Sequence, residues 1–188
     1  LLAYCEELRA MLAGQSALGE KVRVLLDAKP GKAAAKRWDW VRKGAPVILE
    51  VGPRDMAEGK VAMLRRDALW NAANGKPAMQ FLPREEVAAG AGALLEEIQN
   101  ALYNEARARR DANITRGLTD WAGVAAHFEN GGKYPGWVEV EWSKPTGPGL
   151  DAVVEKLKAV KLTIRNVPRE AEAASGTCIF NGAPATER

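Results

Sequence analysis

Short apolar runs alternate with amphipathic stretches through the first part of the chain. Apolar residues recur at helical spacing from residue 1 to about 13, which predicts an amphipathic helix. The segments Lys21–Asp27 and Val47–Val51 have few polar breaks, a pattern typical of strands that are buried on both faces. Between them, Lys32–Lys43 has an Ala-rich start and is expected to be helical, and Lys60–Leu64 later resumes an extended pattern. This order of elements favours an α/β domain.

A long helix is predicted to close this first domain. A polar stretch containing Gly and Pro leads to a short edge strand expected over 78–82. From residue 84 to about 111 the sequence is typical of one continuous helix. Its apolar stripe is formed by Leu94, Leu95, Ile98 and Leu102. We place the domain boundary after this helix, which gives domains of residues 1–112 and 113–188.

The remaining residues have a periodicity of their own, which predicts a small α/β domain. Apolar positions at helical spacing predict helices over 121–128 and 150–160. Alternation of apolar and polar residues predicts strands over 137–142 and 161–167, and a final short strand is expected at 177–180.

A polar elbow, Gly52–Asp55, separates the two strands at the centre of the first domain. Pro53 has no N–H for a strand ladder, Asp55 can cap a short helical turn, and Gly59 can close that turn. In open α/β sheets ligands bind beyond the strand ends, so Arg54 and Asp55 are a candidate contact site. The alternative is a solvated turn in which these two side chains merely pair with each other.

Composition and charge fit an ordinary globular protein with one local basic segment. The 188 residues suffice for one ample domain or two small ones, and they are 47% hydrophobic and 27% charged. The net charge of +3 says little by itself about nucleic acid. The basic segment, residues 29–43, contains Lys29, Lys32, Lys36, Arg37, Arg42 and Lys43, opposed by Asp39. Trp38 and Trp40 lie among these cations, a mixture suited to unstacked bases and phosphates, although a solvated helix face has the same pattern.

An ordered motif runs through the basic segment and the elbow. The motif residues are Trp40, Lys43-Gly44, Pro46, Leu49-Glu50 and Gly52-Pro53-Arg54-Asp55. They resemble the W-x-x-K-G-x-P-x-x-L-E-x-G-P-R-D segment of prolyl-tRNA synthetases of the archaeal and eukaryotic-like group. The resemblance implies the anticodon-binding domain of a class II synthetase, a mixed sheet flanked by helices, followed by a small α/β domain.

The same resemblance implies a function. The chain is then the C-terminal portion of a proline–tRNA ligase and binds tRNA(Pro). The catalytic domain, expected upstream, activates proline with ATP and Mg²⁺ and charges the tRNA for protein biosynthesis. The full-length enzymes of this family are homodimers, and we expect this chain alone to be non-catalytic and to need no cofactor.

Within this resemblance, the candidates for nucleic-acid binding are Lys36, Trp40, Arg54 and Asp55. Arg54 could give paired hydrogen bonds to a guanine edge or a phosphate, and Asp55 could accept the N1 or N2 hydrogens of an unstacked guanine. The family usually has Glu where this chain has Val41, and commonly a basic residue where it has Ile48. Reading of the anticodon is therefore expected to be rearranged or looser. A core position is the alternative for Trp40.

No catalytic or metal-binding set can be assembled from the sequence. Relatives often hold zinc with four cysteines in the small C-terminal domain, but here Ser143 follows Trp142, and the closing motif keeps only Cys178. A structural zinc needs about four N or S ligands, so we predict no zinc and an ordinary buried Cys178. His127 is the one histidine of the chain and is expected at a helix end or half-buried.

Two further expectations concern the origin of the chain and its surroundings. It begins inside an apparent helix without an initiator Met, which indicates part of a longer protein. Two cysteines, no signal peptide and no apolar run of membrane-spanning length predict a cytoplasmic protein without a membrane partner. The alternative function is a free-standing α/β module whose basic segment binds a protein or RNA and has no ligase role.

Overall fold

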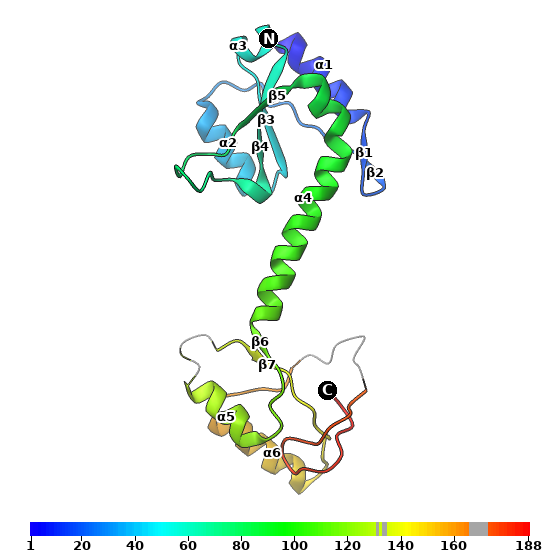
Figure 1. Cartoon of the computed structure of the whole chain (residues 1–188), viewed down its shortest axis with the longest axis vertical. Helices are drawn as coiled ribbons and strands as arrows, with labels where there is room; N and C mark the ends of the chain where they lie inside the picture. The colour runs from blue at the N-terminus through cyan, green and yellow to red at the C-terminus, as the bar shows by residue number, and fades with distance from the viewer. Residues whose placement is uncertain (131, 133–134, 166–172) are drawn as a thin grey trace. The chain divides into compact units, whose positions relative to one another are not determined.

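The structure is a computed structural model of the chain (Figure 1), and it describes residues 1–130, 132, 135–165 and 173–188. The chain divides into two compact units, Leu1–Ala106 (unit 1) and Arg107–Arg188 (unit 2), and each is described by itself. Among the described residues, no helix is both long and apolar enough to cross a membrane. The domain boundary proposed after residue 112 stays a prediction.

Unit 1 is built on a three-stranded antiparallel sheet of order β3-β4-β5, formed by β3 (Val47–Glu50), β4 (Lys60–Arg65) and β5 (Gln80–Pro83). Central β4 buries Val61–Leu64. β3 is only half-buried, and its neighbour in the sheet is β4. The expectation that β3 is buried on both faces was therefore wrong, because β4 takes the central position. The edge strand predicted over 78–82 is confirmed as β5.

The elbow between β3 and β4 has the predicted form. α3 (Pro53–Ala57) begins directly after Gly52, and Pro53 occupies its first turn, where a missing N–H breaks no helical bond. Gly59 follows with a φ of 66°, a left-handed conformation that favours glycine, and the chain then enters β4.

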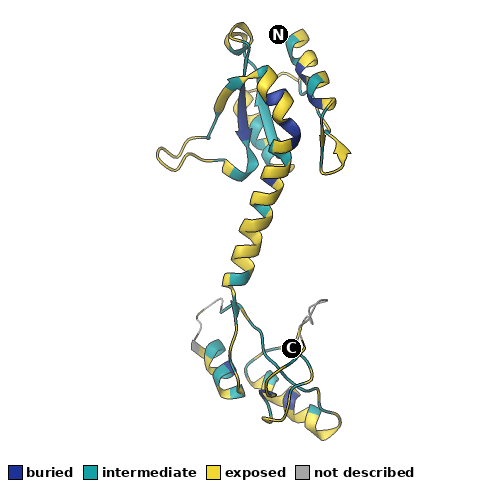
Figure 2. Ribbon diagram, turned by 45° about the vertical axis from the view of Figure 1, so that its right-hand side comes forward, coloured by how far each residue is buried: buried dark blue, intermediate teal, exposed yellow. Residues whose placement is uncertain are grey.

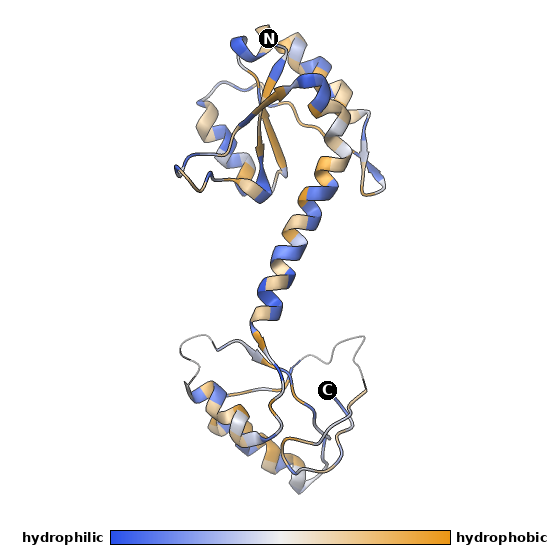
Figure 3. Ribbon diagram, in the orientation of Figure 1, coloured by the Kyte–Doolittle hydropathy of each residue, from blue (hydrophilic) through white to orange (hydrophobic). Residues whose placement is uncertain are grey.

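Helices α1 (Leu2–Ala13) and α4 (Arg84–Ala112) pack against β4, and both match predicted helices. The core that they form consists of Leu8, Leu12, Val61, Met63, Val87, Ala88 and Ala91. Figure 2 shows buried positions gathered where β4, α1 and the first turns of α4 meet. Hydrophobic and hydrophilic positions alternate along α4 (Figure 3). α2 (Ala33–Arg42), also predicted, has no fully buried residue and contacts β3.

The strand predicted over Lys21–Asp27 is not formed. Lys21 instead ends a small hairpin of β1 (Ser16–Ala17) and β2 (Glu20–Lys21). Residues 22–27 belong to no described ladder, and Leu25 is 67% exposed. An apolar run of this kind indicates a preference for extended backbone, but a strand also needs a partner edge, which the pattern does not name.

The polar stretch between β4 and β5 forms a long hairpin connection. A 3₁₀ turn, η1 (Arg66–Ala68), follows β4. Trp70 forms a bridge with Pro77, and Asn71 N donates to Lys76 O over 2.8 Å. The hairpin leaves the end of β4 that is opposite to α3 (Figure 1).

The described part of unit 2 contains two helices at the predicted places and a short parallel strand pair. The helices are α5 (Trp121–Asn130) and α6 (Pro148–Ala159). β6 (Ile114–Thr115) pairs in parallel with β7 (Trp137–Val138). The strand predicted over 137–142 is thus confirmed only at its start.

The strands predicted over 161–167 and 177–180 are wrong as far as the structure describes them. The first five residues of 161–167 form no ladder, and the last two lie outside the described residues. The 177–180 segment makes one isolated bridge and then turns. Cys178 is nonetheless only 1% exposed. The apolar run there reflects burial of a loop, which the pattern alone does not distinguish from burial of a strand.

Candidate nucleic-acid interface

The elbow places Arg54 and Asp55 in α3, beyond the end of β3. Asp55 Oδ2 accepts a hydrogen bond from Gly52 N over 2.8 Å, which caps the start of the helix as predicted. Arg54 Nε donates to Glu58 Oε1 over 3.0 Å, and the Arg54 side chain is 90% exposed. Each of the two therefore has a partner of its own, and the elbow presents an exposed guanidinium beside a carboxylate that holds the backbone.

Lys36 and Trp40, one turn apart on α2, meet at Asp27. Lys36 Nζ lies 3.1 Å from Asp27 Oδ1 and donates to the carbonyl oxygens of Asp27 and Lys29 over 2.7 and 2.8 Å. Trp40 Nε1 donates to Asp27 Oδ2 over 2.9 Å. The Trp40 bond, followed by the Lys36 bond, lowers the pKa of Asp27 from 3.8 to about 2. An ammonium group has three donors, so Lys36 has none to spare for RNA while this arrangement holds.

Trp40 is half-buried rather than a core residue. Lys43 Nζ lies over its ring, 4.2 Å from the centroid, in a cation–π contact. One face of the indole is thus covered by a cation, and its N–H is bonded to Asp27. A base could stack on that face only after Lys43 moves away.

An ion pair joins the basic segment to the end of β3, just before the elbow. Arg37 Nε and Nη2 donate to the two carboxylate oxygens of Glu50 over 2.6 and 2.8 Å. Such a two-bonded pair fixes both position and direction. Because Glu50 is the last residue of β3, the pair ties α2 to the strand end that leads into α3. Lys36 and Trp40 therefore share one partner, Arg54 and Asp55 share one short helix, and Arg37 connects the two sets.

The stacked pair of Trp38 and Trp70 was missed by reasoning from the sequence. The ring centroids lie 4.8 Å apart, with 20° between the ring planes. Trp38 comes from α2, whereas Trp70 belongs to the β4–β5 hairpin and is 57% exposed. The sequence shows Trp38 as an aromatic among cations, but it carries no signal that links this residue to the hairpin.

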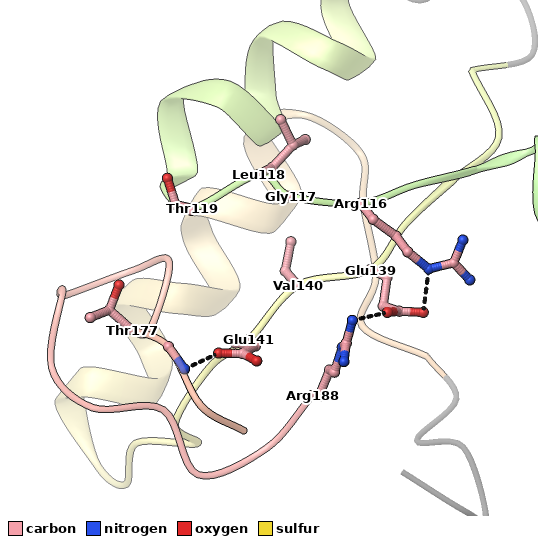
Figure 4. A pocket seen from close by; sticks show the side chains of 10 residues that line it. Arg116, Gly117, Leu118, Thr119, Glu139, Val140, Glu141, Thr177 and Arg188 are labelled. Carbon is pink, nitrogen blue, oxygen red and sulfur yellow. Dashed lines mark hydrogen bonds and ion pairs between the residues drawn. The ribbon is translucent and has the colours of Figure 1, made fainter. Parts of the chain in front are cut away.

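Two hollows accompany these features, one in each unit. In unit 1 a groove of about 1300 Å³ lies between α1, residues 22–27, β3 and α4. In unit 2 a cavity of about 150 Å³ is lined in part by Arg116, Glu139 and Arg188. Glu139 Oε2 lies 3.3 Å from Arg116 Nε, and Glu139 Oε1 lies 3.0 Å from Arg188 Nη2 (Figure 4). The carboxylate in this small cavity is thus already paired with two cations.

The described residues do not fit the zinc site of the resemblance. Cys178 is buried, Cys5 is partly buried, and both are free thiols. Within the ranges that the structure covers, no group of three or more His, Cys, Asp or Glu side chains is placed to hold a metal ion. His127 is half-buried, with Nε2 3.1 Å from Pro135 O, as expected for a structural histidine.

Relatives of the chain are proline–tRNA ligases. Residues 1–75 match the family model of the anticodon binding domain. The chain is 55% identical over 187 residues to the proline–tRNA ligase of Erythrobacter litoralis and 56% identical over 188 residues to that of Novosphingobium aromaticivorans. Each match covers 100% of this chain and 36% of the relative, so the chain spans about a third of the length of these curated proteins.

A solved structure gives the fold. The prolyl-tRNA synthetase from Cryptosporidium parvum, complexed with L-proline and AMP, matches 99% of this chain and 36% of its own with a TM-score of 0.73. At 23% identity this match shows the fold alone, and it confirms the predicted mixed α/β architecture. Residues 1–75 are therefore similar to anticodon binding domains, and the whole chain is similar to about a third of the length of proline–tRNA ligases.

Proposed function

We propose that this chain is the tRNA-binding part of a proline–tRNA ligase and that unit 1 binds the anticodon of tRNA(Pro). The match of residues 1–75 to the anticodon binding domain carries the proposal, because this range contains all four candidate residues, Lys36, Trp40, Arg54 and Asp55. The similarity of the whole chain to part of proline–tRNA ligases favours this function over a free-standing interaction module.

At the elbow, Arg54 is the side chain best placed to meet a base. Its ion pair with Glu58 uses Nε, so both Nη groups can donate in fork geometry to a guanine edge or a phosphate. Asp55 uses Oδ2 for Gly52 N, and its second oxygen can accept a hydrogen from a guanine. An unstacked anticodon exposes these base edges.

The α2 residues contribute in a different way. Lys36 and Trp40 fix Asp27 and so set the shape of the surface beside the basic segment. A direct contact of either one with RNA requires some of these bonds to exchange. Val41 and Ile48 are half-buried and offer no polar group where the resemblance implies Glu and a basic residue, so in this proposal discrimination between bases rests on the elbow.

The test is binding of this chain to a labelled anticodon stem-loop of tRNA(Pro) across a salt series. In a second stem-loop, the guanines at the second and third anticodon positions are replaced. We expect tighter binding to the intact loop, and Arg54→Ala should remove about 1–3 kcal/mol of that preference, the size of one good base contact. Arg107→Ala is the matched control, because it removes another exposed arginine from an i,i+4 ion pair, outside residues 1–75.

Equal affinity for both loops, with only a salt dependence, would refute anticodon reading. It would mean that the basic segment holds the phosphate backbone without regard to sequence. A loss with Arg107→Ala as large as with Arg54→Ala would point to the same conclusion.

We also propose that the complete enzyme is a cytoplasmic homodimer that activates proline with ATP and Mg²⁺ and transfers it to tRNA(Pro). In this proposal the chemistry belongs to the part of the enzyme that this chain does not span. The chain alone should then show no proline-dependent exchange between ATP and pyrophosphate, with a complete prolyl-tRNA synthetase as the positive control. Exchange above background would overturn this assignment.

A further inference from the structure

Trp38 and Trp70, the tryptophan stack, form an aromatic surface that the proposed anticodon contacts leave unused. The two indoles stack with their centroids 4.8 Å apart. Trp38 is half-buried on α2, whereas Trp70 is 57% exposed. The inner ring therefore backs the outer ring, which offers a large flat area to solvent.

The backbone of the hairpin holds Trp70 in place. Trp70 bridges Pro77 across the hairpin, and Ala78 N donates to Leu69 O over 3.0 Å. On its inner side the ring is held by Trp38. Because its backbone is held by the hairpin and one face of its ring by Trp38, the indole loses little conformational freedom on binding and is pre-organised for stacking.

Two exposed cations, Arg42 and Lys76, lie near the residues of the tryptophan stack. Arg42 lies one helical turn after the α2 tryptophan on the same face, is 79% exposed and pairs with Asp39. Lys76 is exposed and lies beside the hairpin tryptophan, next to its bridge partner. Asp67 forms an ion pair with Arg65, with Oδ2 2.8 Å from Nη2. Arg65 also pairs with Glu97 at 2.8 Å, so its charge is already balanced, and Arg42 and Lys76 are the exposed cations near the tryptophan stack.

The tryptophan stack and the elbow lie at opposite ends of the β3–β4 pair. The hairpin with Trp70 follows Arg65, which pairs with Val47 at the start of β3. α3 follows Glu50, at the other end of β3 (Figure 1). The β3 strand separates the two ends by roughly 10–13 Å at a rise of about 3.3 Å per residue. A base at the tryptophan stack is therefore a different one from a guanine at the elbow.

We propose that Trp70, backed by Trp38, stacks on an unpaired base of the bound tRNA other than the guanines read at the elbow, with Arg42 and Lys76 beside the adjoining phosphates. The proposal rests on RNA binding by unit 1. Every base has a flat π-face and charged phosphates on both sides, so an exposed indole flanked by cations suits an unstacked nucleotide of any identity. The positive charge favours RNA over an apolar protein surface, which would gain nothing from the cations.

The test compares binding of the whole chain and its variants to the anticodon stem-loop across a salt series. Trp70→Ala should weaken binding about 5- to 100-fold and leave the salt slope unchanged, because it removes a stacking contact and no charge. Trp70→Phe keeps a ring and should restore most of the affinity. Phe81→Ala is the matched control, because it removes another exposed aromatic ring: Phe81 is 61% exposed on β5, where it pairs with Ala62.

A change in the RNA separates stacking from any disturbance of the hairpin. Abasic nucleotides are placed singly through the loop, while the protein stays intact. At one position, removal of the base should weaken binding to the parent chain but not to Trp70→Ala, because only coupled partners deviate from additivity. That position identifies the stacked base.

Equal affinity of the parent chain and Trp70→Ala would overturn the stacking proposal, and so would the same abasic profile for both. Anticodon reading would still stand if the parent chain prefers the intact loop over the guanine-substituted one. Absence of that preference would overturn anticodon reading instead, whatever the effect of Trp70→Ala.

Discussion

Lys36 and Trp40 are proposed RNA contacts, and both also bond the carboxylate of Asp27. Asp27 lies in the segment that we expected to be a strand, just before the basic segment. In place of a ladder, two side chains of α2 hold the end of this segment. Substitution of either residue would therefore change the shape of the surface, and neutral substitution of Lys36 would also change its charge.

Trp40→Phe should raise the pKa of Asp27. The folded-state pKa of about 2 lies below the ordinary 3.8, so Asp27 contributes stability above pH 4, and this contribution is lost as the pH falls toward 2. The Trp40 hydrogen bond is the largest cause, and its loss should move the pKa up toward the ordinary value. Titration of the Asp27 side-chain carboxyl by NMR measures the shift. Trp38→Phe is the control, and an unchanged pKa in Trp40→Phe would contradict the assignment.

Substitution of Asp55 should lower the stability of the fold, whereas substitution of Arg54 should affect RNA binding and leave stability unchanged. Arg54→Ala removes only an exposed ion pair, so the free energy of unfolding should not change measurably. Asp55→Ala removes the bond to Gly52 N at the start of α3 and should cost about 1 kcal/mol, as loss of a helix cap does. Urea denaturation measures both. Comparable destabilisation by the two variants would show that Arg54 is also structural, and a binding loss in Arg54→Ala could then not be assigned to a contact.

At the scale of elements, the sequence predicts the parts of unit 1 that carry their own stop signals. The Pro and Gly residues of the elbow fix the end of β3 and the start of β4, and α4 has an unbroken apolar stripe. Lys21–Asp27 and 177–180 have apolar runs as well, but their pairing depends on residues distant in sequence. Local patterns report burial and backbone preference, whereas a ladder is a property of two segments.

Alanine substitutions at Gly90 and Gly92 of α4 should change the free energy of unfolding in opposite directions. A Cβ at Gly92 would lie 2.3 Å from the backbone oxygen of Ser16, so Gly92→Ala must push α4 away from the β1–β2 hairpin. We expect a loss of about 1–3 kcal/mol in the free energy of unfolding, typical of overpacking. Gly90 has open space around its Cβ position, and Gly90→Ala should stabilise the helix by about 0.5–1 kcal/mol.

Thermal or urea unfolding of both variants tests this pair. Gly90→Ala is also the control for helix propensity, because both changes add the same methyl group to the same helix. Equal effects of the two variants would show that the hairpin does not pack on α4 at Gly92.

At the scale of the molecule, the candidate interface is assembled from segments that the sequence presents separately. The family motif links Trp40 to the elbow, which is why Trp40, Arg54 and Asp55 could be named from the sequence, whereas Lys36 was named from the wider resemblance. Trp70 lies outside that motif, and its place beside Trp38 follows from the way the β4–β5 hairpin folds back to α2. A contact between elements without a shared motif can be found only in three dimensions.

All the proposed RNA contacts lie in unit 1, which predicts that residues 1–112 alone bind the anticodon stem-loop with the same Kd and the same preference for the anticodon guanines as the whole chain. The core of unit 1 supports this truncation, because its buried residues end at Ile98 on α4, whereas Val124, Val153 and Cys178 are buried within unit 2. A shorter chain, 1–83, is the control: it lacks Val87, Ala88 and Ala91 of the core and should not fold. Circular dichroism and binding by fluorescence anisotropy measure the two properties separately. A folded 1–112 chain that binds the stem-loop markedly more weakly than the whole chain would mean that unit 2 also contacts the RNA, and the interface proposed here would then be incomplete.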